Sequence, residues 1–504
     1  MQRRSLLRGS AALIAAPALL RQALAAEAPR FGLGVASGQP RANGVVLWTM
    51  LTGAGLPERA TVQWEIAHDE SFTRIAARGK ETAELAWSHS VHAEPAGLEP
   101  ARWYWYRFSA LGQQSMVGRT RTAPAADAAG VSFNFVITSC QRWDVGHYAA
   151  WRHIAAESLD AVMFLGDYIY EYTSNAKSVR PVEGGQVRTL AQYRARYATH
   201  KSDPALQAAH AAAPWLLVWD DHEVGNDYAN LQGQDLEPDF TAQRAAAYRA
   251  YWEHMPFAKS ARPVDADMRI VGRLDWGTLA RIHLIDDRQY RDVQACPKPG
   301  RGGSNTLTLK NCPAFLDTRR TLLGADQERW LADGWDATRP WNLLAQQTLM
   351  ARFSWSDPAA SGGGTYWTDG WDGYPAARNR LLGAVAERKL GGVVVLGGDV
   401  HSNYVADLKA DYDDPAGAVI ATEFCGTSIT SLGLEQSRVE AARVFNPHIR
   451  YGRSDQRGYM RFALDAKQLQ MQVRVVDNAL DPSSGIGNAA RFVVEAGRPG
   501  AIPA

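Results

Sequence analysis

The 504-residue chain is poor in the features that define several classes of protein. It has only four cysteines, its 54 basic residues nearly match its 53 acidic residues, and it has no internal repeat. Few cysteines exclude a dense disulfide scaffold, and the balanced charge excludes a disordered or polybasic nucleic-acid-binding chain. No unbroken apolar run reaches the length of a bilayer span, so we expect none. What is present, including 17 tryptophans, suits a large globular protein of two domains.

The first 25 residues have the pattern of a cleavable export signal. Arg3-Arg4 precedes a leucine pair, an apolar stretch covers residues 11–20, and Ala23-Leu24-Ala25 forms a cleavage site. The arginine pair directly before the leucines favours the twin-arginine machinery over an ordinary secretory route. Cleavage would leave 50 basic against 53 acidic residues. We therefore expect a slightly acidic protein, periplasmic or secreted.

Residues 27–123 follow the pattern of a small all-β domain. Turn residues separate short segments rich in β-branched and aromatic residues: Val45–Thr49, Thr61–Ile66 and Trp103–Phe108. Leu98-Glu99-Pro100 followed by Tyr104 is typical of the tyrosine corner of fibronectin-like sandwiches, in which the hydroxyl bonds to the backbone just upstream. We predict such a sandwich here, with its aromatic side chains in the core.

The rest of the chain, residues 131–504, has the periodicity of an α/β domain. Phe133–Ile137 and Ala161–Leu165 are predicted strands on either side of a helix at Tyr148–Glu157, and this β-α-β order predicts a parallel sheet. Three more buried-strand runs and two closing antiparallel strands follow: Trp215–Trp219, Arg281–Ile285, Val393–Leu396, Tyr459–Leu464 and Met471–Val476.

Polar residues that bind metals follow the predicted strands. The four strand ends carry Thr138–Gln141, Gly166–Glu171, Asp220–Glu223 and Gly397–His401. In open α/β sheets the carboxyl ends of the strands form the site, and so many carboxylates require a counter-charge. Each match alone has a simpler explanation, because Asp220 and Asp221 could cap a helix and Cys140 could be a buried apolar residue. Their order along successive strands favours a metal site.

These motifs resemble the alkaline phosphatase D (PhoD-like) family of secreted metallophosphoesterases. The resemblance is carried by Phe31–Gly38, Val45–Trp48, Leu165–Glu171, Trp219–Glu223, Trp371–Pro375, Gly398–His401 and Asn446–Ile449. It implies a four-layer α/β/β/α sandwich behind the small β-domain. It also implies a site with Fe³⁺ and Ca²⁺, one iron and one or two calcium ions, that hydrolyses phosphomonoesters or phosphodiesters.

The resemblance also implies roles for individual residues. Cys140, Tyr170 and His401 would bind iron, since calcium does not take sulfur. Asp167 would bridge the two kinds of metal. Three residues would offer oxygen to calcium: Asp221, Asp399 and Asn226. His222, with Asp221 beside it, would stabilise the phosphoryl oxygens or protonate the leaving group, and Asp220 and Glu223 would support the ligands.

Three arginines are candidates for contact with the phosphate: Arg142, Arg288 and Arg378. Surface ion pairs are an equally good explanation of each. Cys296 and Cys312 bracket a loop rich in glycine and proline, and in an exported protein they are candidates for a disulfide. We expect a monomer that acts on small phosphate esters and binds no nucleic acid stably.

A rival hypothesis is an iron-dependent redox enzyme or oxygenase that uses Cys140, Tyr170 and His401. Against it, the chain lacks the two-histidine, one-carboxylate pattern of such iron sites. A binding module that has lost catalysis is a third possibility, but none of the expected ligand positions is altered.

Overall fold

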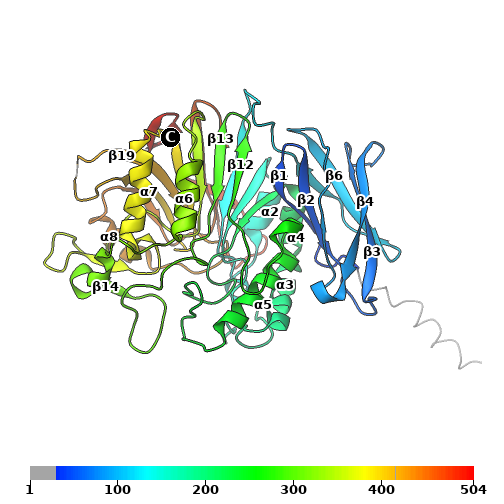
Figure 1. Cartoon of the computed structure of the whole chain (residues 1–504), viewed down its shortest axis with the longest axis horizontal. Coiled ribbons are helices and arrows are strands. Elements are labelled where there is room, and N and C mark those ends of the chain that lie inside the picture. The colour runs from blue at the N-terminus through cyan, green and yellow to red at the C-terminus, as the bar shows by residue number, and fades with distance from the viewer. Residues whose placement is uncertain (1–29, 415) are drawn as a thin grey trace, which may run out of the picture.

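The structure, a computed structural model, describes residues 30–414 and 416–504 (Figure 1). The predicted export signal, residues 1–25, lies outside the described residues. No helix in the described ranges has both the length and the apolar character needed to cross a bilayer.

The N-terminal region is all-β, as predicted. Its strands are β1 (Val35–Arg41), β2 (Gly44–Met50), β3 (Arg59–Ala67), β4 (Ile75–Glu84), β5 (Ser90–Ala93), β6 (Trp103–Ala110), β7 (Gln113–Gln114) and β8 (Gly118–Arg121). Side chains of β6 alternate between buried and half-buried, the pattern of a strand with one face on a core. The N–H of Glu99 donates to Tyr104 Oη at 2.9 Å, which is the predicted tyrosine-corner contact.

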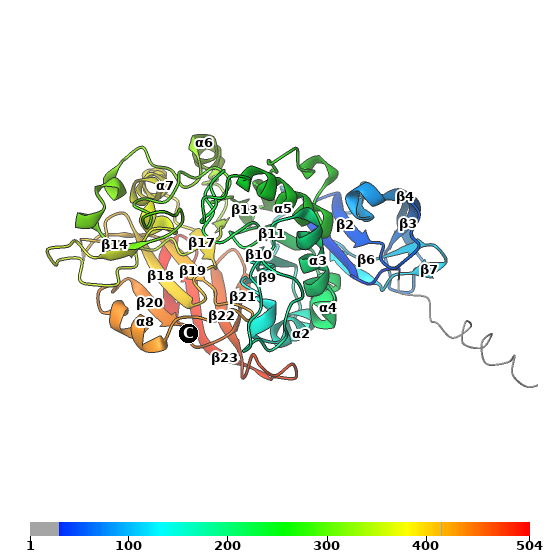
Figure 2. The ribbon, with the colours of Figure 1, turned by 90° about the horizontal axis from the view of Figure 1, so that it is seen from below.

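The N-terminal strands divide between two sheets. β3, β4, β6 and β7 form their own sheet, with β8 beside β6, whereas β1, β2 and β5 extend a ten-stranded sheet that continues into the rest of the chain. The junction is a parallel pair in which Gly38 of β1 lies opposite Trp215 of β11. Figure 2 shows the small sheet projecting from one end of the larger body.

Two large sheets form that body. The first is the ten-stranded sheet, which adds β9 (Phe133–Thr138), β10 (Ala161–Leu165), β11 (Trp215–Val218), β21 (Gly458–Leu464), β22 (Gln468–Val476), β23 (Ile486–Glu495) and β24 (Arg498–Pro503). The second contains β12 (Gly272–Trp276), β13 (Ala280–Leu284), β15 (Trp341–Ala345), β17 (Val393–Gly397), β18 (Asn403–Lys409), β19 (Val419–Cys425) and β20 (Ile449–Arg453). A short ribbon pairs β14 (Thr306–Thr308) with β16 (Thr365–Trp367). The strands predicted from the sequence correspond to β9, β10, β11, β13, β17, β21 and β22.

The two large sheets pack face to face. Phe424 of β19 meets Phe462 of β21 edge to face, with ring centroids 5.4 Å apart, and both side chains are buried. The largest apolar cluster draws residues from both sheets. β9, β10 and β11 are buried along almost their whole length, as expected for parallel strands covered on both faces.

Helices cover the outer faces of both sheets (Figure 1). They are α2 (Ala149–Ala156), α3 (Leu190–Lys201), α4 (Pro204–Ala212), α5 (Phe240–His254), α6 (Ala325–Gly334), α7 (Pro375–Glu387) and α8 (Gln436–Arg443). Short 3₁₀ helices lie at η1 (Leu85–Trp87), η2 (Trp143–Val145), η3 (Lys259–Ala261), η4 (Leu309–Asn311), η5 (Pro313–Leu316) and η6 (Trp371–Gly373). Trp151 of α2 stacks on Trp215 of β11, with centroids 5.0 Å apart. On the second sheet, Leu331 of α6 and Leu382 of α7 share a cluster with Val393.

Candidate functional site

Four strand ends meet at one edge of the paired sheets. Parallel pairing aligns β9 with β10 and β10 with β11, so the residues that follow these strands lie side by side. The fourth strand, β17, belongs to the other sheet. A bridge between Ser139 and Ser428 joins the two sheets at this edge. The four strand ends therefore meet, as the sequence predicts, but the strands belong to two sheets.

The backbone is left-handed at the residues that project into this edge. Positive φ values between 52° and 62° occur at Cys140, Asp167, Asp399 and His401. Non-glycine residues adopt this conformation at a cost of order 1 kcal/mol or more, and such residues cluster at functional sites. Gly166 has φ 111°, and a Cβ there would lie 2.4 Å from Cβ of Asp220. The chain turns sharply after each strand, and only glycine fits at Gly166.

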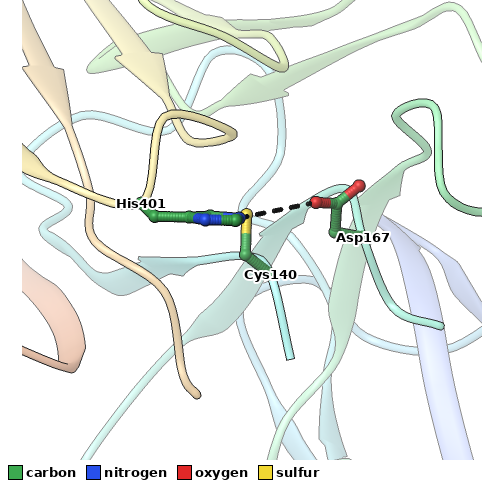
Figure 3. A group of neighbouring side chains, drawn as sticks. All are labelled: Cys140, Asp167 and His401. Carbon is green, nitrogen blue, oxygen red and sulfur yellow. Dashed lines mark ion pairs between the residues drawn. The ribbon is translucent and has the colours of Figure 1, made fainter. Parts of the chain in front are cut away.

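Cys140, Asp167 and His401 form the first cluster of possible metal ligands. Figure 3 shows their side chains converging from separate segments, and their ligand atoms lie within 4.8 Å of one another. His401 Nε2 is 4.0 Å from Asp167 Oδ2. The other ring nitrogen of His401, Nδ1, lies 2.8 Å from the carbonyl oxygen of Leu432, which leaves Nε2 for the cluster.

The phenol of Tyr170 is the fourth group of this cluster. Tyr170 Oη donates to Asp167 Oδ2 at 2.7 Å and lies 3.1 Å from His401 Nε2. Burial, together with the negative charge of Asp167, raises the pKa of both the Tyr170 phenol and the Cys140 thiol well above their ordinary values. Both groups therefore stay protonated until a cation takes the place of the protons.

Two further clusters adjoin the first. One contains Asp167, Asp221 and His222, and the other contains Asp221, Asp227 and Asp369. The first and second clusters share Asp167, and the second and third share Asp221. The three clusters therefore form a continuous row. Asp399 and Asn226 line the same cleft, where Asp399 Oδ2 accepts from Thr348 Oγ1 at 2.6 Å and Asn226 Oδ1 from Tyr172 Oη at 2.6 Å.

The donor set of this row fits bound cations. Within the described residues, Asp167 Oδ1 and Asp221 Oδ1 are buried and have no hydrogen-bond donor. Burial, with the charges of Asp369 and Asp221, raises the pKa of Asp227 to about 6. Burial also raises the pKa of Asp399 well above its usual range. Carboxylates crowded in this way are stabilised when a metal supplies positive charge.

His222 lies at the wall of the cleft, next to two carboxylates. Its Nδ1 lies 2.8 Å from Glu171 Oε2, and its ring contacts those of Tyr170 and Tyr172, at centroid distances of 4.0 and 5.0 Å. Burial alone would lower the pKa of His222, but the charges of Asp221 and Glu171 raise it well above its ordinary value. The side chain lines the cleft, so Nε2 is the nitrogen available to a substrate.

Glu223 and Asp220 connect segments at this edge of the sheets. Glu223 accepts hydrogen bonds from the N–H groups of Asp167, Tyr168 and Asp220, at 3.1, 2.5 and 2.8 Å. It thereby ties the turn after β10 to the turn after β11. Asp220 pairs with the guanidinium of Arg288 at 2.5 Å.

The three arginines that are candidates for phosphate contact all form ion pairs in the structure. Arg288 is buried between Asp220 and Asp369, Arg378 is buried and pairs with Asp372 at 2.6 Å, and Arg142 pairs with Asp144 at 2.6 Å. None of the three lines the cleft. The charge of each arginine neutralises a buried or largely buried carboxylate. Sequence spacing alone cannot distinguish an arginine in such an ion pair from one that binds phosphate.

Several residues of the site were not assigned roles from the sequence. They are Glu171, Asp227, Asp369, Ser431 and Arg457. Ser431 Oγ lies 2.7 Å from Tyr170 Oη, and Arg457 donates to the backbone oxygen of His401 at 3.1 Å. Glu171 is the last residue of the motif Gly166–Glu171, and Asp227 directly follows Asn226, so sequence position could have indicated both. Ser431 and Arg457 come from turns with no recognisable pattern.

The predicted disulfide is present, between Cys296 and Cys312. Cys140 and Cys425 are free and buried. The loop that the disulfide closes lies against the third cluster, because Ser304 N donates to Asp227 Oδ2.

The clusters open into a cleft of about 680 Å³. Its polar side contains Asp167, Asp221, His222, Asn226, Asp227, Asp399 and His401. A volume of this size takes a small organic molecule rather than an inorganic ion alone.

Comparison with known proteins shows which proteins the chain resembles. The sequence profile of the PhoD-like phosphatases matches residues 135–473, and that of their N-terminal domain matches residues 15–124. The chain is 41% identical over 483 residues to alkaline phosphatase D of Bacillus subtilis (strain 168), covering 92% of this chain and 81% of that protein. A solved structure titled "Structure of PhoD" superposes with a TM-score of 0.88 at 39% identity, covering 94% of this chain and 92% of the other.

Proposed function

Because the chain belongs to the PhoD-like phosphatase family, and is therefore a hydrolase of phosphoric esters, we propose that its row of clusters holds one iron and one or two calcium ions. The observation that carries the proposal is the split in donor chemistry along the row. A thiol and a phenol stand at one end, and carboxylates alone stand at the other. Soft and phenolic donors suit ferric iron, whereas calcium takes oxygen.

In this proposal Cys140, Tyr170 and His401 hold the iron and Asp167 is shared. The calcium ligands are Asp221, Asp399 and Asn226, and Asp227 and Asp369 offer oxygens to a second calcium. Ser431 would orient the Tyr170 oxygen through their contact of 2.7 Å. We propose phosphomonoesters, phosphodiesters or both as substrates.

The bound metals would neutralise the phosphoryl oxygens and lower the pKa of a water molecule that attacks phosphorus. The residues of the chain do the rest. Glu171 fixes the His222 ring through Nδ1, and Asp221 adds negative charge beside that ring. His222 Nε2 then donates its proton to the departing alkoxide oxygen.

We further propose the wider setting of the enzyme. Residues 1–25 would direct export by the twin-arginine machinery to the periplasm or the medium. Residues 27–123 would be a fibronectin-like β-sandwich domain. The two large sheets with helices outside them would be the four-layer α/β/β/α sandwich of a metallophosphoesterase domain over residues 131–504. The protein would act as a monomer on small esters.

Elemental analysis and visible absorption of the purified protein test the metal assignment. We expect iron near one equivalent, calcium at one or two, and a phenolate-to-iron absorption band. Tyr170→Phe should remove the band, whereas Tyr172→Phe, which alters a neighbouring tyrosine outside the iron ligands, should keep it. Two zinc ions, or a band unchanged in Tyr170→Phe, would refute the assignment.

A further inference from the structure

The cleft has apolar lining residues as well as candidate metal ligands. We call a group of these apolar residues the apolar arm, and it consists of Leu349, Phe353, Trp355, Trp367, Leu432 and Leu434. Phe353 and Leu349 are buried core residues, but Leu432 is 68% exposed and Leu434 39% exposed, and both tryptophans are only partly buried. Exposed apolar side chains gathered at the wall of a cleft mark a binding surface.

Three separate segments build the apolar arm. Phe353 and Trp355 follow β15, Trp367 ends β16, and the two leucines lie between β19 and α8. β16 is fixed because Trp367 lies opposite Thr306 of β14, and β14 belongs to the loop closed by Cys296 and Cys312. The disulfide and the pairing of β14 with β16 therefore hold Trp367 of the apolar arm in place.

The apolar arm begins next to the candidate metals. The carbonyl oxygen of Leu432 lies 2.8 Å from Nδ1 of His401, so one short segment both orients a metal ligand and contributes to the arm. A phosphoryl group at the metals would place the organic part of its ester along the arm. A cleft of about 680 Å³ has room for that part.

The side chains of the arm favour a flat ring over a flexible chain. Trp355 packs edge to face on Phe353, with centroids 4.9 Å apart, and the guanidinium of Arg438 lies 5.5 Å from the Trp355 ring centroid. Arg438 lines the cleft, is exposed, and has no ion pair among the described residues. Indole rings together with an arginine are the groups on which proteins stack nucleobases, whereas an acyl chain needs no cation.

We propose that the apolar arm binds a nucleobase or a similar aromatic ring on the alcohol side of the ester, so that nucleotide-type phosphoesters are the preferred substrate class. This inference rests on the proposed phosphoesterase function. Trp355 and Trp367 supply the stacking faces, and Arg438 covers the outer end.

A matched pair of substrates tests the inference without a change of leaving group. Adenosine 5′-monophosphate and ribose 5-phosphate release the same kind of primary alcohol and differ in the base. We expect kcat/KM to be about 5- to 100-fold higher for the nucleotide. Adenosine, which has no phosphate, should bind in calorimetry and inhibit competitively, and ribose should do so far more weakly. Equal kcat/KM values for the pair would overturn the inference.

Variants locate the preference in the arm. Trp355→Ala and Trp367→Ala should each lower the nucleotide-to-sugar ratio of kcat/KM about 10-fold, and Trp355→Phe, which keeps a ring, should lower it less. Trp103→Ala is the control. Trp103 is a partly buried tryptophan on β6 that packs against Arg119 of β8, outside the cleft. An unchanged ratio in both cleft variants would refute the proposal.

Two outcomes separate this inference from its premises. If no phosphoric ester is hydrolysed at all, the proposed function fails and not merely the preference. If short acyl esters of glycerol 3-phosphate exceed glycerol 3-phosphate by a larger factor than the nucleotide exceeds the sugar, the arm binds acyl chains and the aromatic class is refuted.

Discussion

The N–H of Ser304 lies 2.8 Å from Oδ2 of Asp227, so the middle of the disulfide-closed loop contacts a carboxylate of the candidate calcium site. Gln234 donates to the same oxygen at 3.0 Å. The disulfide between Cys296 and Cys312 thus helps to hold the candidate ligand Asp227 in place through Ser304.

The first prediction concerns this bond. Cys296→Ser combined with Cys312→Ser should lower the free energy of unfolding by about 3 kcal/mol, the value expected for a closed loop of this length, and should weaken calcium binding. Thermal unfolding and calcium titration measure the two effects. Lys310→Ala, in the same loop, is the control that keeps the disulfide. An unchanged calcium affinity in the double variant would show that Ser304 does not depend on the bond.

The second prediction concerns His222. His222→Gln should reduce kcat by roughly 10²- to 10⁴-fold on an alkyl phosphate. The loss should be much smaller on a 4-nitrophenyl ester, because nitrophenolate departs without a proton. Glu171→Gln should show the same dependence on leaving group with a smaller loss, and His153→Gln on α2 should show none. Equal losses on the two esters would contradict proton donation by His222.

The third prediction concerns Gly166. Gly166→Ala adds a Cβ that would lie 2.4 Å from Asp220 Cβ, in a backbone conformation that already disfavours L-residues. We expect a loss of stability of at least about 3 kcal/mol. Gly130→Ala is the matched control, since it also has positive φ but open space around its Cβ, and its cost should be about 1 kcal/mol. Urea unfolding compares the two, and equal costs would contradict the steric argument.

The fourth prediction concerns pH and Lys201. This buried amine lies 4.2 Å from the centroid of the Trp48 ring, and burial lowers its pKa to about 7. Between pH 7 and about 10 the unfolded chain therefore binds more protons at this lysine than the folded protein does, so its contribution makes stability rise with pH.

Lys201→Met removes that contribution. We expect the variant to be more stable than the wild type at pH 7, with a difference that shrinks as the pH approaches 10. Lys298→Met removes an exposed amine and controls for the change in net charge. Urea unfolding at several pH values measures the difference, and a difference that grows with pH would have the wrong sign.

The strands and the grouping of polar residues after them could be predicted from the sequence for a physical reason. A parallel strand buried on both faces is a short apolar run, and the polar residues directly after it must lie at one edge of the sheet. That reasoning located Cys140, Asp167, Asp221 and His401. It could not show that His401 comes from the opposite sheet, since pairing between distant strands leaves no local signal.

The arginines show where the same reasoning stops. Arg288 is one position away from an acidic pair, and only the three-dimensional packing shows that Asp220 and Asp369 enclose its guanidinium. Ser431 and Arg457 reach the site through turns, and turns have no periodicity that a sequence pattern could detect. The attachment of β1 to β11 was likewise not predictable, because it is a single backbone pairing at Gly38.

The position of β9 in its sheet has a consequence for synthesis of the chain. β9 carries Cys140 at its end, and its neighbour on one side is β21, where Met460 lies opposite Ile137. A ribosome must therefore make nearly the whole chain before β9 acquires that partner, and until then its apolar edge is open to other chains. Nascent chains that stop before Gly458 should aggregate, and the sheet edge that carries the candidate site is completed late in synthesis.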